Sequence, residues 1–355
     1  MKKFCIFYPL LALAVLSCNK AHQPAPEEDE NAWVNDESLR VPVQFASRTD
    51  VETKAINYGP ITGSVMNSLD VGVISVAEKQ SDGSPIVWDK SLEGSILIDN
   101  LMVTTSETGE IVFSPKIYYP FGNQYAYSFY SYYPYANING EAASIVDGAY
   151  SITYDLGNTD ILWANSVASD YNGVAGYNAA YCRAVKQDGV ESQYFPKLQY
   201  KHLLTAMVFK VVGKDSDIAN YDVKVTGLQI TNTSSKATLT VADSNGANSG
   251  VITGNEDGGS IGFTNLDVTP TATASELCTI LAMPASNYTA EITLTVDGAN
   301  QSTVELNIGS ESTSYDAGYI YYFTVTINNP QEVTIIQTGL DEWIAGDYPD
   351  EGKEI

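Results

Sequence analysis

Residues Tyr118 to Ala136 read YYPFGNQYAYSFYSYYPYA, and nearly half of these positions are tyrosine. Alternate positions from Tyr125 to Tyr135 separate into an aromatic face and a mixed face. The aromatic face holds Tyr125, Tyr127, Phe129, Ser131, Tyr133 and Tyr135, and the other face holds Ala126, Ser128, Tyr130, Tyr132 and Pro134. This asymmetry predicts a strand whose rings pack a sandwich core. Tyr130 and Tyr132, on the other face, are candidate ligand contacts.

The rest of the chain carries the same kind of strand signal. Segments such as VGVISVAE, GEIVFSP, TAMVFKVVG, AEITLTVDG and YIYYFTVTI are separated by Gly, Pro, Asn and Asp. No stretch has the pattern of a long amphipathic helix. We therefore expect an all-β chain of short antiparallel strands, packed as sandwiches. The strand rhythm is interrupted between Tyr181 and Tyr200, which predicts an N-terminal domain over 41–195 and a C-terminal domain over 196–355.

The first residues, MKKFCIFYPLLALAVLSCNK, have the pattern of a secretion signal that is too short to span a bilayer. Its end, Val15-Leu16-Ser17-Cys18, resembles a bacterial lipobox. This predicts a signal peptide over 1–17 and acyl chains on Cys18, with insertion in the outer membrane. The alternative is an ordinary cleaved signal with a chance cysteine. Residues 18–40 are acidic and contain two prolines, and we expect them to form a solvated tether.

Charge and cysteine content exclude several classes of protein. The formal net charge is −25, and a field of this sign repels phosphate backbones, so we expect no nucleic-acid partner. Of the four cysteines, Cys5 leaves with the signal and Cys18 is assigned to the lipid. Cys182 and Cys278 remain, and the sequence leaves open whether they pair.

No catalytic or cofactor motif is found in the sequence. The two histidines, His22 and His202, cannot form an HExxH site, and no phosphate loop, dinucleotide fingerprint or nucleophile elbow occurs. DSNGANSG, which begins at Asp243, resembles a calcium loop, but its twelfth position is Gly254 and not an acid, so we expect a hairpin turn. His202 lies in an apolar run and is expected to be a core or edge residue. We predict no enzyme activity, no cofactor and no metal.

Several segments together resemble the fimbrillin-like family, the lipoprotein-derived subunits of type V pili. They are, in chain order, VPVQFASRTDVETKA after the tether, YSFYSYYP, TDILWANS from Thr159, YKHLLTAMVFKV from Tyr200, LAMPA from Leu281, and GYIYYFTVTI followed by TGLDEWIAG. Each motif is short, but their order covers nearly the whole chain. The acidic end, DYPDEGKEI, departs from the family pattern.

The resemblance implies two tandem transthyretin-like β-sandwich domains and maturation by a trypsin-like protease at the cell surface. The leaving strand would be Leu39 to Ala46, with cleavage after Arg48 or, as second choice, Lys54. The vacated groove would accept a strand from another pilus subunit by β-strand addition. The donor would come from 333–344. Its marker residues are Val333, Ile335, Ile336, Leu340 and Trp343.

The favoured hypothesis is therefore a non-enzymatic structural subunit or tip adhesin of a cell-surface fimbrium. The first alternative is a surface lipoprotein that captures glycans for nutrient uptake through exposed aromatic side chains. The second is a secreted glycan-degrading enzyme, which would need two carboxylates in one cleft. The sequence leaves open a stalk, tip or anchor role, the glycan or protein receptor, and which basic residue is cleaved.

Overall fold

The structure is a computed structural model. It describes residues 39–45, 53–54, 62–63, 68–80, 86, 88–107, 109–121, 124–167, 170–214, 218, 221–255, 258–298, 300–310 and 312–343, with the side chains of 53–54, 62–63 and 79–80 outside the description. Contacts divide the chain into two units, residues 1–40 and residues 41–355. Every strand described lies in the second unit.

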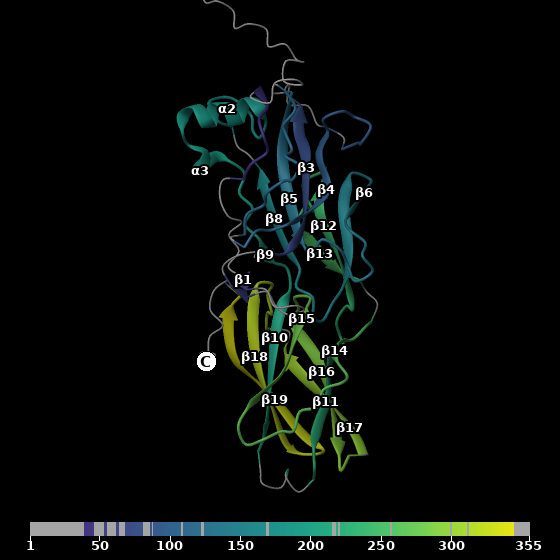
Figure 1. Ribbon diagram of the computed structural model, residues 1–355. Coiled ribbons are helices and arrows are strands. Elements are labelled where there is room, and N and C mark those ends of the chain that lie inside the picture. Colours follow the sequence, from purple (N-terminus) through teal and green to yellow (C-terminus); the bar gives the residue numbers. More distant parts are fainter. Residues whose placement is uncertain are drawn as a thin grey trace, which may run out of the picture. The chain divides into compact units, whose positions relative to one another are not determined.

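The N-terminal part of this unit contains two larger sheets, and Figure 1 shows their strands together with α2 and α3. The first sheet has the order β4 (Ile96–Thr104), β3 (Asp70–Gln80), β5 (Tyr125–Tyr133), β8 (Leu162–Val167) and β9 (Lys201–His202). The second has the order β13 (Val251–Gly254), β12 (Lys236–Asp243), β7 (Ala149–Asp155) and β6 (Ser144–Val146). A separate short pair is formed by β1 (Thr53–Lys54) and β2 (Thr62–Gly63).

Two further sheets are built from the C-terminal part of the chain. One has the order β15 (Ser275–Ala282), β10 (Thr205–Gly213), β18 (Tyr319–Asn329) and β19 (Glu332–Glu342). The other has the order β14 (Ile261–Phe263), β11 (Lys224–Ile230), β16 (Asn287–Val296) and β17 (Asn300–Gly309). The β10–β18 pair is parallel, and the other paired strands described are antiparallel. The all-β prediction is confirmed.

Strand β5 is buried on both of its faces, whereas the sequence predicted one core face. Tyr127 and Phe129 are almost completely buried on one face, and Tyr130 and Tyr132 are 4% and 0% exposed on the other. The small residues between the rings, such as Ser128, are buried as well. Tyr132 reaches across to the second sheet, where its hydroxyl accepts the backbone N–H of Ala143 at 3.0 Å. The strand therefore needs a cover on each side.

The second sheet, which covers the Tyr130 and Tyr132 face, joins distant parts of the chain. β12 pairs along its length with β7, and Trp163 of β8 donates its indole N–H to Val241 O at 2.8 Å. β12 and β13 form the hairpin predicted at Asp243, whose carboxylate accepts hydrogen bonds from Asn245 and Asn248. This pairing crosses the predicted domain boundary near residue 195, and the two-domain division stays a prediction.

Two short helices occupy the interruption predicted between Tyr181 and Tyr200: α2 (Ala179–Asp188) and α3 (Glu191–Tyr194). The Asn178 side chain caps α2 by accepting the N–H of Tyr181 at 2.9 Å. Gly189 ends it in the left-handed region at φ 68°, which a residue without Cβ adopts without strain. The buried stripe of α2 includes Tyr181, Cys182 and Val185.

Cys182 and Cys278 are both free and buried, so they do not form a disulfide. Burial raises the pKa of each thiol to about 12, which keeps it protonated near neutral pH. A chain that begins at Asn19 contains only these two cysteines. We expect Ellman's reagent at about pH 8 to modify neither thiol in the native chain and both in guanidinium chloride. A thiol that reacts rapidly in the native chain would contradict the buried placement.

Candidate functional site

Residues 41–45, the described part of the predicted leaving strand within this unit, run antiparallel to residues 117–119. The N–H of Val43 donates to Ile117 O at 2.8 Å, and the N–H of Tyr119 donates to Val41 O at 2.9 Å. No other backbone hydrogen bond of residues 41–45 is found among the described residues. The segment is thus held to its neighbour by a very short ladder.

The side chains of this segment add packing contacts to its two backbone hydrogen bonds. Val41 and Val43 are buried at 7% and 6% exposure, and the half-buried Phe45 points to the same side. The Phe45 ring meets Phe129 of β5 edge-on, with centroids 5.4 Å apart, and lies 6.2 Å from the ring of Phe113. The segment therefore forms part of the second cover of β5, on the Phe129 face.

The surface under the segment is aromatic and uncharged. Tyr119 contacts both Tyr127 and Phe129, with centroids 6.2 and 6.4 Å apart, and Phe129 contacts Tyr177 at 5.8 Å. Burial raises the pKa of Tyr119, Tyr127 and Tyr177 above the ordinary value of a phenol, so these hydroxyls stay neutral. A hollow of about 330 Å³ lies beside the segment, lined among others by Val43, Phe45 and Phe113.

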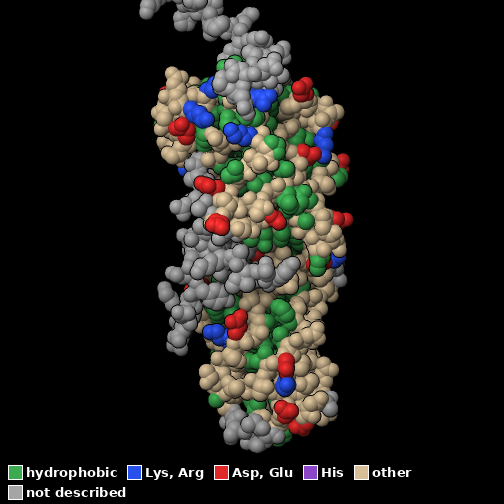
Figure 2. Space-filling model, in the orientation of Figure 1, with side chains coloured by type: hydrophobic (Ala, Val, Ile, Leu, Met, Phe, Trp, Pro, Cys, Tyr) green, Lys and Arg blue, Asp and Glu red, His purple; other side chains and the backbone are tan. Residues whose placement is uncertain are grey.

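Basic side chains lie near this segment although the chain is strongly acidic. On the face drawn in Figure 2, Lys and Arg side chains gather at the end that carries α2. Lys186 of α2 donates to Gln44 Oε1 at 3.3 Å, and Lys116 lines the hollow together with Glu110. Two lysines and one glutamate thus lie at the rim of this site, next to an apolar interior.

The predicted donor residues lie in and directly after β19. This strand is the edge of its sheet among the described strands, and it pairs with β18 from Glu332 to Glu342. Val333 is buried and Ile335 half-buried, whereas Ile336 and Leu340 are 60% and 40% exposed. The five predicted residues thus divide between the core and an open surface.

Trp343 ends this strand in a buried contact that joins three of the quoted motifs. Its ring stacks on the ring of His202 with centroids 3.9 Å apart and planes at 13°. His202 Nδ1 lies 2.9 Å from Asp160 Oδ2, and both side chains are buried. We name Asp160, His202 and Trp343 the terminal cluster. The N–H of Trp343 also donates to Gly318 O at 2.7 Å, which fixes the chain at this point.

The other predicted site residues are either buried or outside the described part of the structure. Tyr130 and Tyr132 are buried, and the Tyr130 hydroxyl donates to Glu78 at 2.9 Å, so neither ring presents a face to solvent in this fold. Cys18 and Arg48 lie outside the described residues. Lys54 lies in β1, and its side chain is not described.

Sequence reasoning missed the partners of the two end segments. Of residues 117–119, which pair with the leading segment, Tyr118 and Tyr119 belong to the aromatic stretch quoted first, and nothing in their pattern predicted this partner. Asp160 was quoted in TDILWANS, and only its closeness to His202 shows its role. Among the described residues, no group of three or more His, Cys, Asp and Glu side chains could hold a metal ion, and no helix is long and apolar enough to cross a membrane.

Replacement of Phe45 by alanine tests the cover over β5. We expect Phe45→Ala to lower the free energy of unfolding by about 2 kcal/mol, because the ring leaves a space over Phe129. The neighbouring, exposed Gln44→Ala should change it by less than about 0.5 kcal/mol. Urea denaturation of both variants checks this, and equal effects would mean that Phe45 does not pack as described.

Replacement of Trp343 tests the anchoring of β19. We expect Trp343→Ala to speed amide hydrogen exchange over residues 332–343, because the terminal cluster loses the ring that stacks on His202. Ile336→Ala, on the exposed side of the same strand, is the matched control and should leave exchange nearly unchanged. Unaltered protection in Trp343→Ala would show that pairing with β18 alone holds the strand.

Comparisons with known proteins show what this chain is similar to. A family model described as fimbrillin-like matches residues 67–343, and no curated protein matches the chain. Similar solved structures include a candidate cell adhesion protein from Bacteroides uniformis, with 19% identity, a TM-score of 0.47, and coverage of 86% of this chain and 99% of that chain. A fimbrial protein from Bacteroides vulgatus has 13% identity, a TM-score of 0.48, and coverage of 86% and 99%.

The fimbrial anchor protein Mfa2 from Porphyromonas gingivalis is another similar structure, with 11% identity, a TM-score of 0.38, and coverage of 87% of this chain and 99% of that chain. The match to the family model itself covers well over half of the 355 residues. This chain belongs to the fimbrillin-like family.

Proposed function

We propose that this protein is a non-enzymatic fimbrial subunit that is exported as a lipoprotein and assembled by protease-triggered strand exchange. The fimbrillin-like family is a family of fimbrial structural proteins, and fimbriae lie at the cell surface. In this proposal, Cys18 carries the lipid that holds the precursor in the outer membrane. A surface trypsin-like protease cuts after Arg48, or after Lys54, and frees the leading segment.

The observation that carries the proposal is how residues 41–45 are held. Two backbone hydrogen bonds and the side chains of Val41, Val43 and Phe45 fix the segment over the aromatic face of β5. Once the chain is cut, the segment is no longer linked covalently to the groove, and in this proposal the loss of that link lets it dissociate. Its loss would expose apolar rings and unpaired backbone groups of 117–119, which a strand of another subunit could cover.

The C-terminal strand has the chemistry of such a replacement. Its Val333 and Ile335 would enter the groove where Val41 and Val43 lay, and Ile336 and Leu340 already face outward. The segment also carries Asp341 and Glu342, which could pair with Lys186 and Lys116 at the rim. Donation requires β19 to leave β18 and the terminal cluster to open, so the Trp343 contact would keep the donor docked before assembly.

Treatment of a purified chain that begins at Asn19 with an Arg-specific protease tests the proposal. We expect a product that begins at Thr49 and forms oligomers, measured by mass spectrometry and size-exclusion chromatography. A synthetic peptide of residues 333–344, VTIIQTGLDEWI, should bind the cleaved chain and suppress the oligomers, because it occupies the groove.

The controls separate cleavage from exchange. Arg48→Ala should stay monomeric under the same treatment, because an Arg-specific protease does not cut after lysine. A trypsin-like protease applied to the same variant then tests Lys54 through a product that begins at Ala55. A peptide with Ile335→Asp and Val333→Asp should not bind, because a charge would enter the apolar groove. Complete cleavage after Arg48 with no oligomer and no peptide binding would refute strand exchange.

A further inference from the structure

We propose that this subunit also binds a neutral oligosaccharide, in a polar trough between β7 and the loop that follows β5. Two hollows of about 460 and 650 Å³ lie there, within the size range of small-molecule sites. Asn137 lines both of them, so the hollows adjoin at this residue and are taken together as the trough. The leading segment and the terminal cluster do not take part in it, except that Asp160 reaches the wall of the larger hollow.

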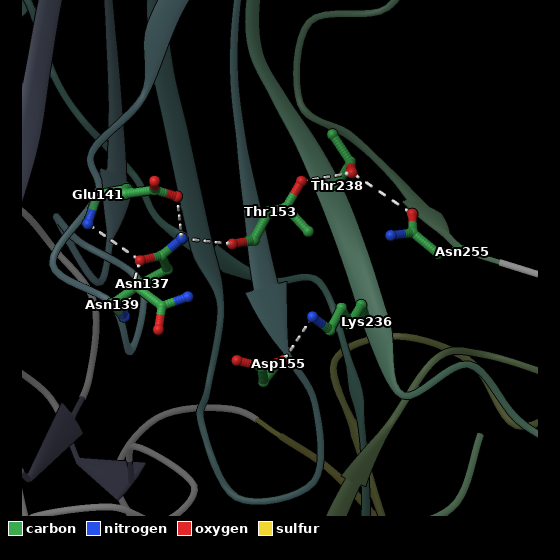
Figure 3. Close-up of polar contacts among 8 residues, drawn as sticks. All are labelled: Asn137, Asn139, Glu141, Thr153, Asp155, Lys236, Thr238 and Asn255. Atoms are coloured by element: carbon green, nitrogen blue, oxygen red, sulfur yellow. Dashed lines mark hydrogen bonds and ion pairs between the residues drawn. The ribbon is translucent and has the colours of Figure 1, made fainter. Parts of the chain in front are cut away.

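Hydroxyl groups of β6 and β7 line the smaller hollow of the trough. Ser144 of β6 and Ser151 and Thr153 of β7 belong to this lining, and the register sets Ser144 opposite Ser151. The Thr153 hydroxyl also lies 2.8 Å from the hydroxyl of Thr238 in β12 (Figure 3). Adjacent strands are about 4.8 Å apart, so the two paired serine hydroxyls can meet successive hydroxyls of one sugar ring.

The rim of the trough is fixed before any ligand arrives. Figure 3 shows the Asn137 side chain directed at the loop that contains it and at β7. Its Oδ1 accepts the N–H groups of Asn139 and Glu141 at 3.0 Å, and its Nδ2 donates to Thr153 O at 3.1 Å. A rigid rim lowers the entropy cost of binding, which matters for a ligand held mainly by hydrogen bonds.

Polar and apolar groups alternate around the larger hollow. Asn158 is exposed and Thr159 half-exposed on one side, and both offer donors and acceptors. The same lining includes the half-buried Tyr133 and Ile138, which is 82% exposed. A sugar ring needs both kinds of contact, since its hydroxyls form hydrogen bonds and its C–H face packs on apolar groups.

The acidic side chains that line the trough determine which class of glycan it can bind. None of the described residues that line the two hollows is basic, and Glu141, Asp155 and Asp160 are acidic. Lys236, beside the trough, already lies 3.6 Å from Asp155 (Figure 3). On a chain with a net charge of −25, this field would repel sulfated or sialylated glycans and nucleic acids. A neutral oligosaccharide meets no such repulsion.

A glycan array of neutral, sialylated and sulfated oligosaccharides, probed with the chain that begins at Asn19, tests this inference. We expect binding to at least one neutral glycan and to none of the anionic ones. Titration calorimetry with that glycan should show affinity lowered about tenfold by Asn158→Ala and by Glu141→Ala, because each removes hydrogen-bonding groups at the rim. Thr303→Ala, an exposed hydroxyl on β17, is the matched control and should leave the affinity unchanged.

Glycan binding is measured on the uncut monomer, so its result does not depend on whether strand exchange takes place. Thermal unfolding of each variant confirms that the fold is kept. Absence of binding to every neutral glycan, binding to anionic glycans alone, or equal affinities of the trough and control variants would overturn the inference. The inference would also be overturned if a peptide that pairs with β6, the short edge strand, displaced the bound glycan. The trough would then be a protein-docking surface.

Discussion

A strand that is buried on both faces requires a separate cover on each side, and β5 imposes this requirement on the whole N-terminal part. On the Tyr132 face the cover is a sheet in which β12 pairs with β7 over many residues. On the Phe129 face, part of the cover is the short segment 41–45, held by two backbone hydrogen bonds. One cover is thus a sheet paired over many residues, and the other is in part a single short segment of the chain. This difference is what makes a removable strand physically reasonable at that place.

The strand nature of β5 could be predicted from its period of two, and so could the burial of Tyr127 and Phe129. The burial of Tyr130 and Tyr132 could not, because tyrosine is equally suited to an exposed surface and to a core that satisfies its hydroxyl. Here the hydroxyl of Tyr132 meets Ala143 of a neighbouring layer, and a local pattern does not contain that information. The all-β class followed from local composition, whereas pairing partners depended on contacts far apart in the sequence.

For the candidate sites, too, local sequence patterns do not reveal which distant residues come into contact. His202 could be predicted as a buried histidine from its apolar neighbours, but Asp160 and Trp343 are brought to it only by the fold. The short helix α2 escaped notice because its buried stripe is brief and lies among polar residues. The outward residues of β6 and β7, such as Ser144 and Ser151, look in sequence like any solvated strand face. Their place in the lining of one trough appears only when the register is known.

Residues 41–45 and β19 are held in place in different ways, and in the proposed exchange this difference decides the direction. When β19 leaves its own sheet it would lose its backbone hydrogen bonds with β18. When it enters the groove of another subunit it would form new ones with residues 117–119 and neighbouring groups. Hydrogen bonding alone therefore contributes little to the free energy of the exchange. The leading segment, by contrast, is kept in its groove by being part of the same chain, which gives it a high effective concentration. Cleavage removes that advantage and lets the segment diffuse away. The cut, rather than a stronger donor, would therefore drive assembly forward, and the Phe129 face would remain covered until that cut is made.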